Sequence, residues 1–281
     1  MNKSHRILGL AVASAAVIAA VGMAAAQSML PAGVDKVEVA PPSADHPLNP
    51  LRSGWTYRTQ ETQRLQSDDF ENPAMLWVET GQTLWNKVDG EAGKSCASCH
   101  NDAATSMKTV GASMPKWSEK LGKPINLEMQ INECRTEQMK AEAWKFDTEP
   151  LKAMTTFVRH QARGVPVKVQ SDGPMQPWWE KGKEIYYTRY GQLNLACASC
   201  HEQNNGKYLR ADYLSQGHTN GFPTYRLKTT GMVSVHSRFF GCIRDVRATP
   251  FERLSDEFLA LELYVAWRGT GLPVETPAVR Q

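Results

Sequence analysis

Two identical five-residue segments carry the clearest chemistry in this chain. Residues 96–100 and 197–201 both read Cys-Ala-Ser-Cys-His, and they lie 101 positions apart. In a C-x-x-C-H segment the two thiols form thioether bonds to a haem, and the adjacent histidine binds the iron as its proximal ligand. A zinc site built from two C-x-x-C pairs, or a pair of redox disulfides, would not need a histidine directly after both. We therefore predict two covalently bound haem c groups, attached through Cys96, Cys99, Cys197 and Cys200 and ligated by His100 and His201.

Two further cysteines remain, one in each half of the chain. The two halves end in similar segments, Gly-Val-Pro-Val over 164–167 and Gly-Leu-Pro-Val over 271–274. Cys134 lies 30 residues before Gly164, and Cys242 lies 29 residues before Gly271. In c-type cytochrome domains this region supplies the distal iron ligand, so we predict ligation by histidine and cysteine at both haems. A thiolate ligand would place the haem potential well below that of a cytochrome with histidine and methionine ligands.

Two alternatives stay open for these cysteines. An oxidising compartment favours a disulfide between Cys134 and Cys242, although equivalent positions in a repeat should each face their own haem. The distal ligand could instead be a nearby methionine or histidine: Met129, Met139, His218, Met232 or His236.

Charge distinguishes the surroundings of the two cysteines. Arg238 precedes Cys242 by one helical turn, whereas Gln130 stands at the matching place in the first half. Arginine suits bidentate binding of a sulfonate or carboxylate group, and a cationic mouth beside a thiolate would attract a small oxyanion. We predict Arg238 as the anion-binding residue. Haem propionates or a neighbouring aspartate are alternative partners for the other two arginines nearby, Arg244 and Arg247.

The elements that must position these residues are repeated as well. Residues 77–85 and 178–186 keep Trp, Glu and Gly at the same spacing and share the pattern G-x-x-Leu/Ile-aromatic, which is typical of the N-terminal helix of a cytochrome c fold. Residues 151–158 and 258–265 place apolar side chains at i, i+3, i+6 and i+7, which predicts helices with one apolar face. With no alternating strand pattern, we predict an all-α protein of two tandem cytochrome c domains from an internal duplication.

The N-terminus predicts export. Residues 1–26 combine a basic start, an apolar stretch and small residues before Gln27, which is typical of a cleaved signal peptide; an uncleaved anchor is the alternative. We then expect an extended N-terminal arm over 27–60, a first cytochrome c domain over 61–172 and a second over 173–281. No later segment is long and apolar enough to cross a bilayer, so we expect a periplasmic protein without a membrane span in its mature form.

The sequence resembles the SoxA family, subunits of the SoxAX cytochromes of thiosulfate oxidation, in its dihaem branch. The resemblance covers essentially the whole mature chain. It rests on the two haem-attachment motifs, on the segment around Cys134, and above all on Arg238-Phe239-Phe240-Gly241-Cys242 with Arg247 following.

This resemblance implies an activity, L-cysteine S-thiosulfotransferase. The second haem would be the catalytic one, with Cys242 as a persulfide-bearing ligand and Arg238 and Arg247 as catalytic arginines. Thiosulfate would be joined to a cysteine of a SoxYZ-type carrier protein, and two electrons would pass to a SoxX-type monohaem cytochrome c subunit in a heterodimer. Thiosulfate and a thiolate are both nucleophiles, so they cannot join until two electrons leave.

Other functions remain open at this point. A dihaem thiosulfate dehydrogenase that forms tetrathionate could use the same ligands and would need no carrier. A plain dihaem electron carrier would make the arginines incidental, and a dihaem peroxidase would need an open distal position. The formal net charge is +3, or +1 once Lys3 and Arg6 leave with the signal peptide, which does not indicate a nucleic-acid partner.

Overall fold

The computed structural model describes residues 30–281. The expected signal peptide over 1–26 and the first residues of the expected arm lie outside this range. Within the described range, no helix has the length and apolar character needed to cross a membrane.

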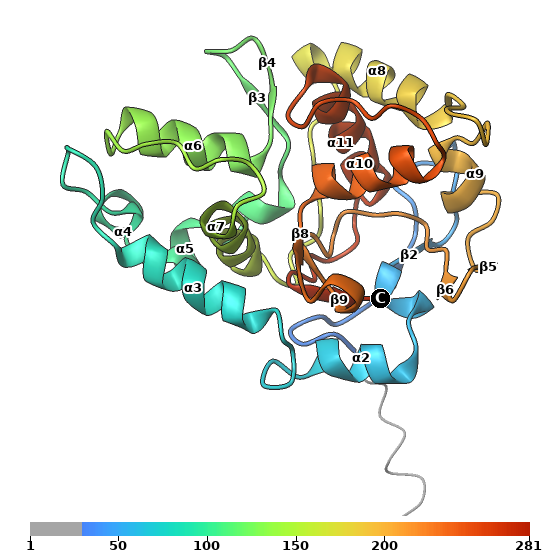
Figure 1. Ribbon diagram of the computed structural model, residues 1–281, viewed down its shortest axis with the longest axis horizontal. Helices are drawn as coiled ribbons and strands as arrows, with labels where there is room; N and C mark the ends of the chain where they lie inside the picture. Colours follow the sequence, from blue (N-terminus) through green and yellow to red (C-terminus); the bar gives the residue numbers. More distant parts are fainter. Residues whose placement is uncertain (1–29) are drawn as a thin grey trace, which may run out of the picture.

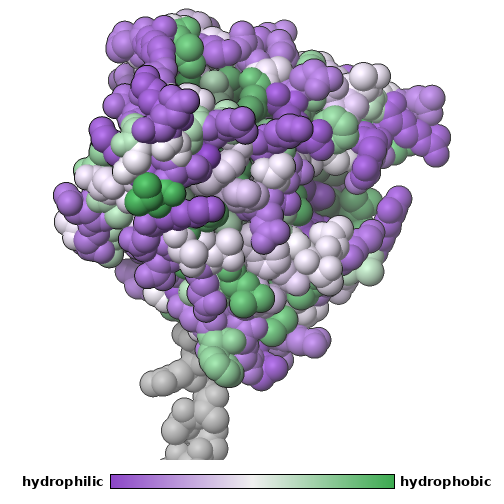
Figure 2. Space-filling model, turned by 60° about the vertical axis from the view of Figure 1, so that its left-hand side comes forward, coloured by the Kyte–Doolittle hydropathy of each residue, from purple (hydrophilic) through white to green (hydrophobic). Residues whose placement is uncertain are grey.

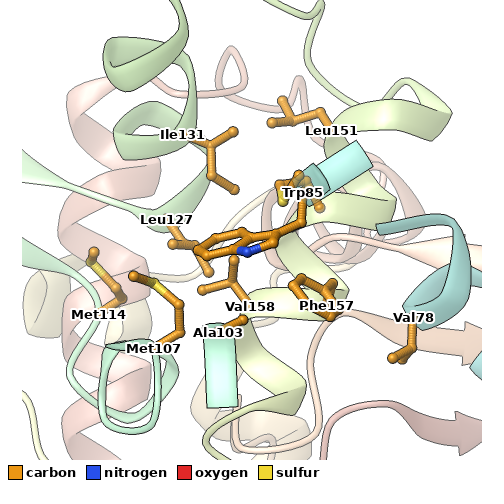
Figure 3. Packing of buried hydrophobic residues seen from close by; sticks show 11 residues of the cluster. Val78, Trp85, Ala103, Met107, Met114, Leu127, Ile131, Leu151, Phe157 and Val158 are labelled. Atoms are coloured by element: carbon orange, nitrogen blue, oxygen red, sulfur yellow. The ribbon is translucent and has the colours of Figure 1, made fainter. Parts of the chain in front are cut away.

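The first half is built on two crossed helices. α3 (Met75–Asn86) packs against α7 (Glu149–His160). At the crossing, a Cβ atom on Gly81 would lie 2.4 Å from the carbonyl oxygen of Ala153, so only glycine allows the two backbones to come this close. Trp85, one turn further on, lies in the middle of the apolar core between these helices (Figure 3).

The second half repeats this helix pair (Figure 1). α8 (Gln176–Tyr187) packs against α11 (Asp256–Arg268). Here a Cβ atom on Gly182 would lie 2.0 Å from the carbonyl oxygen of Ala260. The helices predicted over 258–265 and, in the first half, over 151–158 are therefore present, and each packs on the glycine-bearing helix of its own half.

Each half adds two helices to this pair. The haem-attachment motifs form the short helices α4 (Cys96–His100) and α9 (Cys197–His201). The two remaining cysteines lie on α6 (Leu127–Glu137) and α10 (Val235–Asp245). The other helical elements of the described chain are η1 (Gly54–Tyr57), α2 (Gln60–Ser67), α5 (Ala103–Ser106), η2 (Val110–Ala112), η3 (Gly173–Met175) and η4 (Leu227–Thr229).

The all-α expectation is correct only for the helical framework, because residues 30–281 also form four small sheets. Their strands are two or three residues long, too short to give an alternating pattern in the sequence. All pairs are antiparallel except β7 with β9, which is parallel. The sheets are β1 (Glu38–Val39) with β2 (Leu51–Arg52), β3 (Lys116–Ser118) with β4 (Lys123–Ile125), β5 (Tyr208–Leu209) with β6 (Asp212–Tyr213), and β8 (Gly231–Val233) with β7 (Thr224–Arg226) and β9 (Ala278–Arg280).

The hairpins reveal more of the duplication than the sequence patterns did. The β3–β4 hairpin precedes α6, and the β7–β8 hairpin precedes α10. The two hairpins and the helices after them match strand for strand at a constant spacing of 108 positions. Residues on these segments can therefore be compared one to one between the halves.

The two halves meet at a buried interface that follows this internal symmetry. A cavity of about 10 Å³, room for about one water molecule, lies between them. Matched positions from both halves line it, namely Met114 with Phe222, Leu127 with Val235, and Thr155 with Glu262.

The described part of the N-terminal arm packs along the second half. Leu48 and Leu51 form a small apolar cluster with Leu272, and the Gln216 side chain donates a hydrogen bond to the Pro50 carbonyl at 3.0 Å. The outer face in Figure 2 is mostly hydrophilic, with hydrophobic side chains gathered in separate small patches.

Candidate functional site

In the second half, the motif histidine is oriented as a metal ligand. His201 Nδ1 lies 2.7 Å from the carbonyl oxygen of Ser215; since a carbonyl only accepts, Nδ1 carries the proton and the Nε2 lone pair is free. Burial lowers the pKa of His201 to about 4, so the ring is uncharged at neutral pH, as a ligand must be. A Cβ atom on Gly217 would lie 2.7 Å from the imidazole Cγ. This cradle fits a proximal haem ligand.

A buried arginine near this histidine also fits a haem. Arg268 is fully buried and forms an ion pair with Glu202. Within residues 30–281 its Nε and Nη2 atoms have no hydrogen-bond partner, and its charge contributes to the lowered pKa of His201. Buried N–H groups without an acceptor are costly, and a haem propionate would supply carboxylate oxygens. The residues present therefore fit the group that the motif predicts.

The motif of the first half is more open to solvent. His100 and Cys99 are exposed, and Cys96 is half-buried. The His100 ring lies 5.8 Å from the ring of Trp85, whose indole nitrogen donates to the Asn101 carbonyl at 3.2 Å. The proximal histidine of this half thus lies against an aromatic core residue.

Each remaining cysteine lies beside the motif of its own half. Burial first, and the Cys134 thiol second, raise the pKa of Cys96. In the same way, burial and then Cys242 raise the pKa of Cys197 to about 12 and also raise the pKa of Cys200. The structure thus brings together the groups expected to surround each haem, while axial ligation by these cysteines stays a prediction.

The structure bears on three alternatives: a disulfide between the two remaining cysteines, a zinc site, and His236 as the distal ligand. All six cysteines are free, so no disulfide joins Cys134 to Cys242. The part of the chain described contains no cluster of three or more metal-binding side chains, so the two C-x-x-C pairs do not meet in a zinc site. His236 accepts a hydrogen bond at Nδ1 from the Leu254 amide at 3.0 Å, and its Nε2 lies 2.9 Å from a Glu262 carboxylate oxygen. Its Nδ1 is therefore hydrogen-bonded, whereas its Nε2 faces a carboxylate without forming a hydrogen bond to any described residue.

The two arginines proposed from the sequence, Arg238 and Arg247, differ in exposure and in their contacts. Arg238 is half-buried on α10, one turn before Cys242. Its charge acts on Cys200 and on His201, so its guanidinium lies in the expected haem region. Arg247 follows the helix in a left-handed conformation with φ of 60°, is exposed, and donates to the Gln192 side-chain oxygen at 3.4 Å.

Sequence reasoning missed a third arginine in this region. Arg226, at the end of β7, is half-buried. Burial first, then the nearby charge of Arg238, lower its pKa to about 10, while Asp212 and Cys242 act in the opposite direction. No motif marks Arg226, because the hairpin brings it to Cys242 from 16 positions upstream. The region thus combines a thiol with two cationic groups, an arrangement that can hold an anion against a sulfur atom.

Comparison with known proteins places this chain in a family. The family described as "SoxA/TsdA, cytochrome c domain" matches residues 80–167. The chain is similar to the L-cysteine S-thiosulfotransferase subunit SoxA of Pseudaminobacter salicylatoxidans, with 62% identity over 84% of this chain and 83% of that protein. The subunit of the same name from Paracoccus pantotrophus is 51% identical over 86% of this chain and 84% of that protein.

A solved structure agrees with these sequence comparisons. The fold matches a chain in the crystal structure of SoxXA from P. pantotrophus with a TM-score of 0.86 and 48% sequence identity. The match covers 91% of this chain and 99% of that chain. A cytochrome c domain implies covalently bound haem c.

Proposed function

Because the chain belongs to the SoxA family of L-cysteine S-thiosulfotransferase subunits, we propose that it joins thiosulfate oxidatively to a cysteine of a SoxYZ-type carrier protein. The observation that carries this proposal is the neighbourhood of Cys242, where the thiol and the Arg238 guanidinium lie together beside the second haem-attachment motif. In the first half, the same place beside Cys134 holds the uncharged Gln130.

The overall step balances as a two-electron oxidation. One bond forms between the outer sulfur of thiosulfate and the carrier cysteine sulfur, which gives a cysteine S-thiosulfonate. The thiol proton goes to solvent, and two electrons leave the sulfur atoms. A bound haem c supplies the outlet for these electrons, and a SoxX-type monohaem partner receives them.

In this proposal each site residue of the second half has its own role. Arg238 holds the sulfonate group, so the outer sulfur of thiosulfate points toward Cys242. Cys242 would bind the haem iron and would carry the extra sulfur atom of a persulfide, which is soft and polarisable. His201 would also bind the iron, with its ring orientation fixed by the Ser215 carbonyl. Arg247, exposed at the end of α10, adds positive charge at the rim.

We base the assignment of the haems, the export and the domains on the same family. Two haems are bound, through Cys96, Cys99 and His100 with Cys134, and through Cys197, Cys200 and His201 with Cys242. The chain is exported to the periplasm after cleavage behind residue 26, and residues 27–60 form the arm. Residues 61–172 form the first cytochrome c domain, and residues 173–281 form the catalytic one.

The test is carrier-dependent thiosulfate oxidation by the complete complex with and without Arg238. We expect Arg238→Ala to lower turnover by about a hundredfold, because removing one preorganised donor to a reacting anion costs this much, with both haem spectra unchanged. The control is Arg244→Ala, on the same helix, where the side chain is exposed and pairs with Asp245 at 3.2 Å. Unchanged turnover in Arg238→Ala would remove this residue from the site.

The same assay separates the competing functions. Tetrathionate formation without any carrier would favour a thiosulfate dehydrogenase, and intact haems without thiosulfate turnover would favour an electron carrier. Mass spectrometry of the Cys242 peptide, from protein isolated without reductant, tests the persulfide directly. One added sulfur atom is expected, and an unmodified cysteine would contradict that part of the mechanism.

A further inference from the structure

We propose that Arg226 is a second anion-binding residue of the site, which holds the sulfonate group of thiosulfate together with Arg238. This inference rests on the proposed function and extends it from one binding residue to a pair. A planar guanidinium on each side of a small oxyanion gives more hydrogen bonds and a more defined orientation than either group alone.

The hairpin before α10 aims Arg226 at this region. Arg226 pairs with Gly231 across β7 and β8, and β8 leads directly into α10. The ring of Tyr225 packs 5.7 Å from Trp77 on α3 of the first half. Because side chains alternate along a strand, Arg226 points to the opposite face, where the charges of Arg238 and Cys242 act on its guanidinium.

The first half of the chain provides an internal comparison. At the constant spacing of 108 positions, Arg226 corresponds to Ser118 and Arg238 corresponds to Gln130. The Ser118 hydroxyl only closes its own hairpin, by accepting from the Leu121 amide at 3.3 Å. Both cationic groups therefore occur in the second half alone, at positions whose backbone framework the two halves share. The first half forms the same hairpin and helix without an arginine at this position, and the second half differs by the third strand, β9, whose Arg280 lies opposite Arg226.

The charges around Arg226 are not balanced by protein acids. Within the described range neither Arg226 nor Arg238 forms an ion pair, although both are half-buried. The nearby acid, Asp212, already pairs with Arg58, whose guanidinium also donates to the Tyr213 carbonyl at 2.6 Å. Two half-buried cations that act on each other's charge repel unless an anion joins them. A substrate dianion such as thiosulfate matches this demand.

The anion that competes with thiosulfate for Arg226 is a haem propionate. Propionate pairing has a separate candidate in Arg268, whose buried Nε and Nη2 lack acceptors among residues 30–281. The experiment must therefore read the haem and the thiosulfate separately.

The test uses the complete haem-loaded complex and the variant Arg226→Ser, which copies the first half. Isothermal titration with thiosulfate, and with sulfate as an unreactive dianion, should show a dissociation constant raised by about tenfold or more. The KM for thiosulfate should rise to a similar extent while the KM for the carrier stays the same. Arg226→Lys keeps the charge and should recover part of the affinity, because an ammonium replaces the bidentate contact.

The matched control is Lys228→Ala, an exposed lysine two residues away in the same hairpin, which should leave both constants unchanged. Unchanged thiosulfate affinity in both Arg226 variants would overturn the proposal, and so would an altered haem potential with unchanged thiosulfate affinity. Should the wild-type complex bind thiosulfate through Arg226 but fail to load the carrier, the proposed function would fall and the anion site would stand.

Discussion

α6 in the first half and α10 in the second hold a cysteine at the same place, but their other side chains differ in charge. α6 contains one arginine and three glutamates, a formal net charge of −2, whereas α10 contains two arginines and one aspartate, a formal net charge of +1. In the first half charged side chains of α6 form ion pairs within the protein, such as Arg135 with Asp89 at 2.8 Å. In the second half neither Arg226 nor Arg238 forms an ion pair with another described residue. The duplication thus kept the framework and changed the chemistry at a few positions.

The most direct way to break this comparison is to remove each cysteine in turn. We expect Cys242→Met to lower carrier-dependent thiosulfate oxidation by at least about a hundredfold, because the sulfur that faces the substrate is lost. Cys134→Met should cost less than about tenfold, and its main effect should be a higher potential of the first haem. Turnover assays and redox titration of both variants measure this. Equal losses of turnover would show that the two halves act as one catalytic unit.

The shared framework can be tested at its two helix crossings. A Cβ atom on Gly182 would lie 2.0 Å from the Ala260 carbonyl oxygen, against 2.4 Å between Gly81 and Ala153 in the first half. We expect Gly182→Ala to lower the free energy of unfolding by about 3 kcal/mol, because the helices must move apart. For a chain of this size that lowers Tm by about 5–10 °C.

Gly81→Ala should be destabilising to a similar or smaller extent, since it meets the same kind of backbone contact at a slightly longer distance. Thermal unfolding followed by circular dichroism, with the haem absorbance of each variant, gives both values. An unchanged Tm in either variant would mean that the two helices of that half can shift without cost.

The interface between the halves offers a prediction about pH. Glu128 and His236 are matched positions 108 residues apart, and both are buried near Glu262. Burial, with the Glu262 carboxylate second, raises the pKa of Glu128 from 4.5 to about 7. Between these pH values the folded protein keeps a proton that the unfolded chain has lost. The free energy of unfolding therefore falls as pH rises from about 4.5 to about 7. Above about pH 7 the titration of Glu128 causes no further change.

Glu128→Gln removes this dependence, because the amide resembles the protonated acid. At pH 8 the variant should be more stable than the wild type by up to about 3 kcal/mol, and at pH 4 the difference should vanish. Denaturant unfolding of both proteins at the two pH values gives the difference directly. A difference that is the same at pH 4 and pH 8 would show that Glu128 does not titrate in this range.

Sequence reasoning found the haem-attachment motifs and the repeat, because each is marked by local spacing, and the same spacing led to Arg238, whose role stays a prediction. It missed the hairpins and Arg226, because strands of two or three residues leave no periodic pattern and their pairing depends on contacts between distant segments. The resemblance also implied Arg247 as a catalytic arginine, which stays a prediction. The left-handed turn after α10 gives Arg247 an exposed position against Gln192.

The smallest expected effect concerns this turn, which the first half repeats at Lys140. Lys140 has φ of 54° and Arg247 has φ of 60°, and glycine adopts this conformation without the cost that a side chain adds. We expect Lys140→Gly and Arg247→Gly each to raise the free energy of unfolding by at most about 1 kcal/mol. Arg247→Gly should also raise the KM for thiosulfate by less than about threefold, because a rim charge in water is screened. Denaturant unfolding and steady-state assays measure both. A tenfold rise in KM for Arg247→Gly alone would mean that this arginine turns inward and contacts the substrate in the working complex.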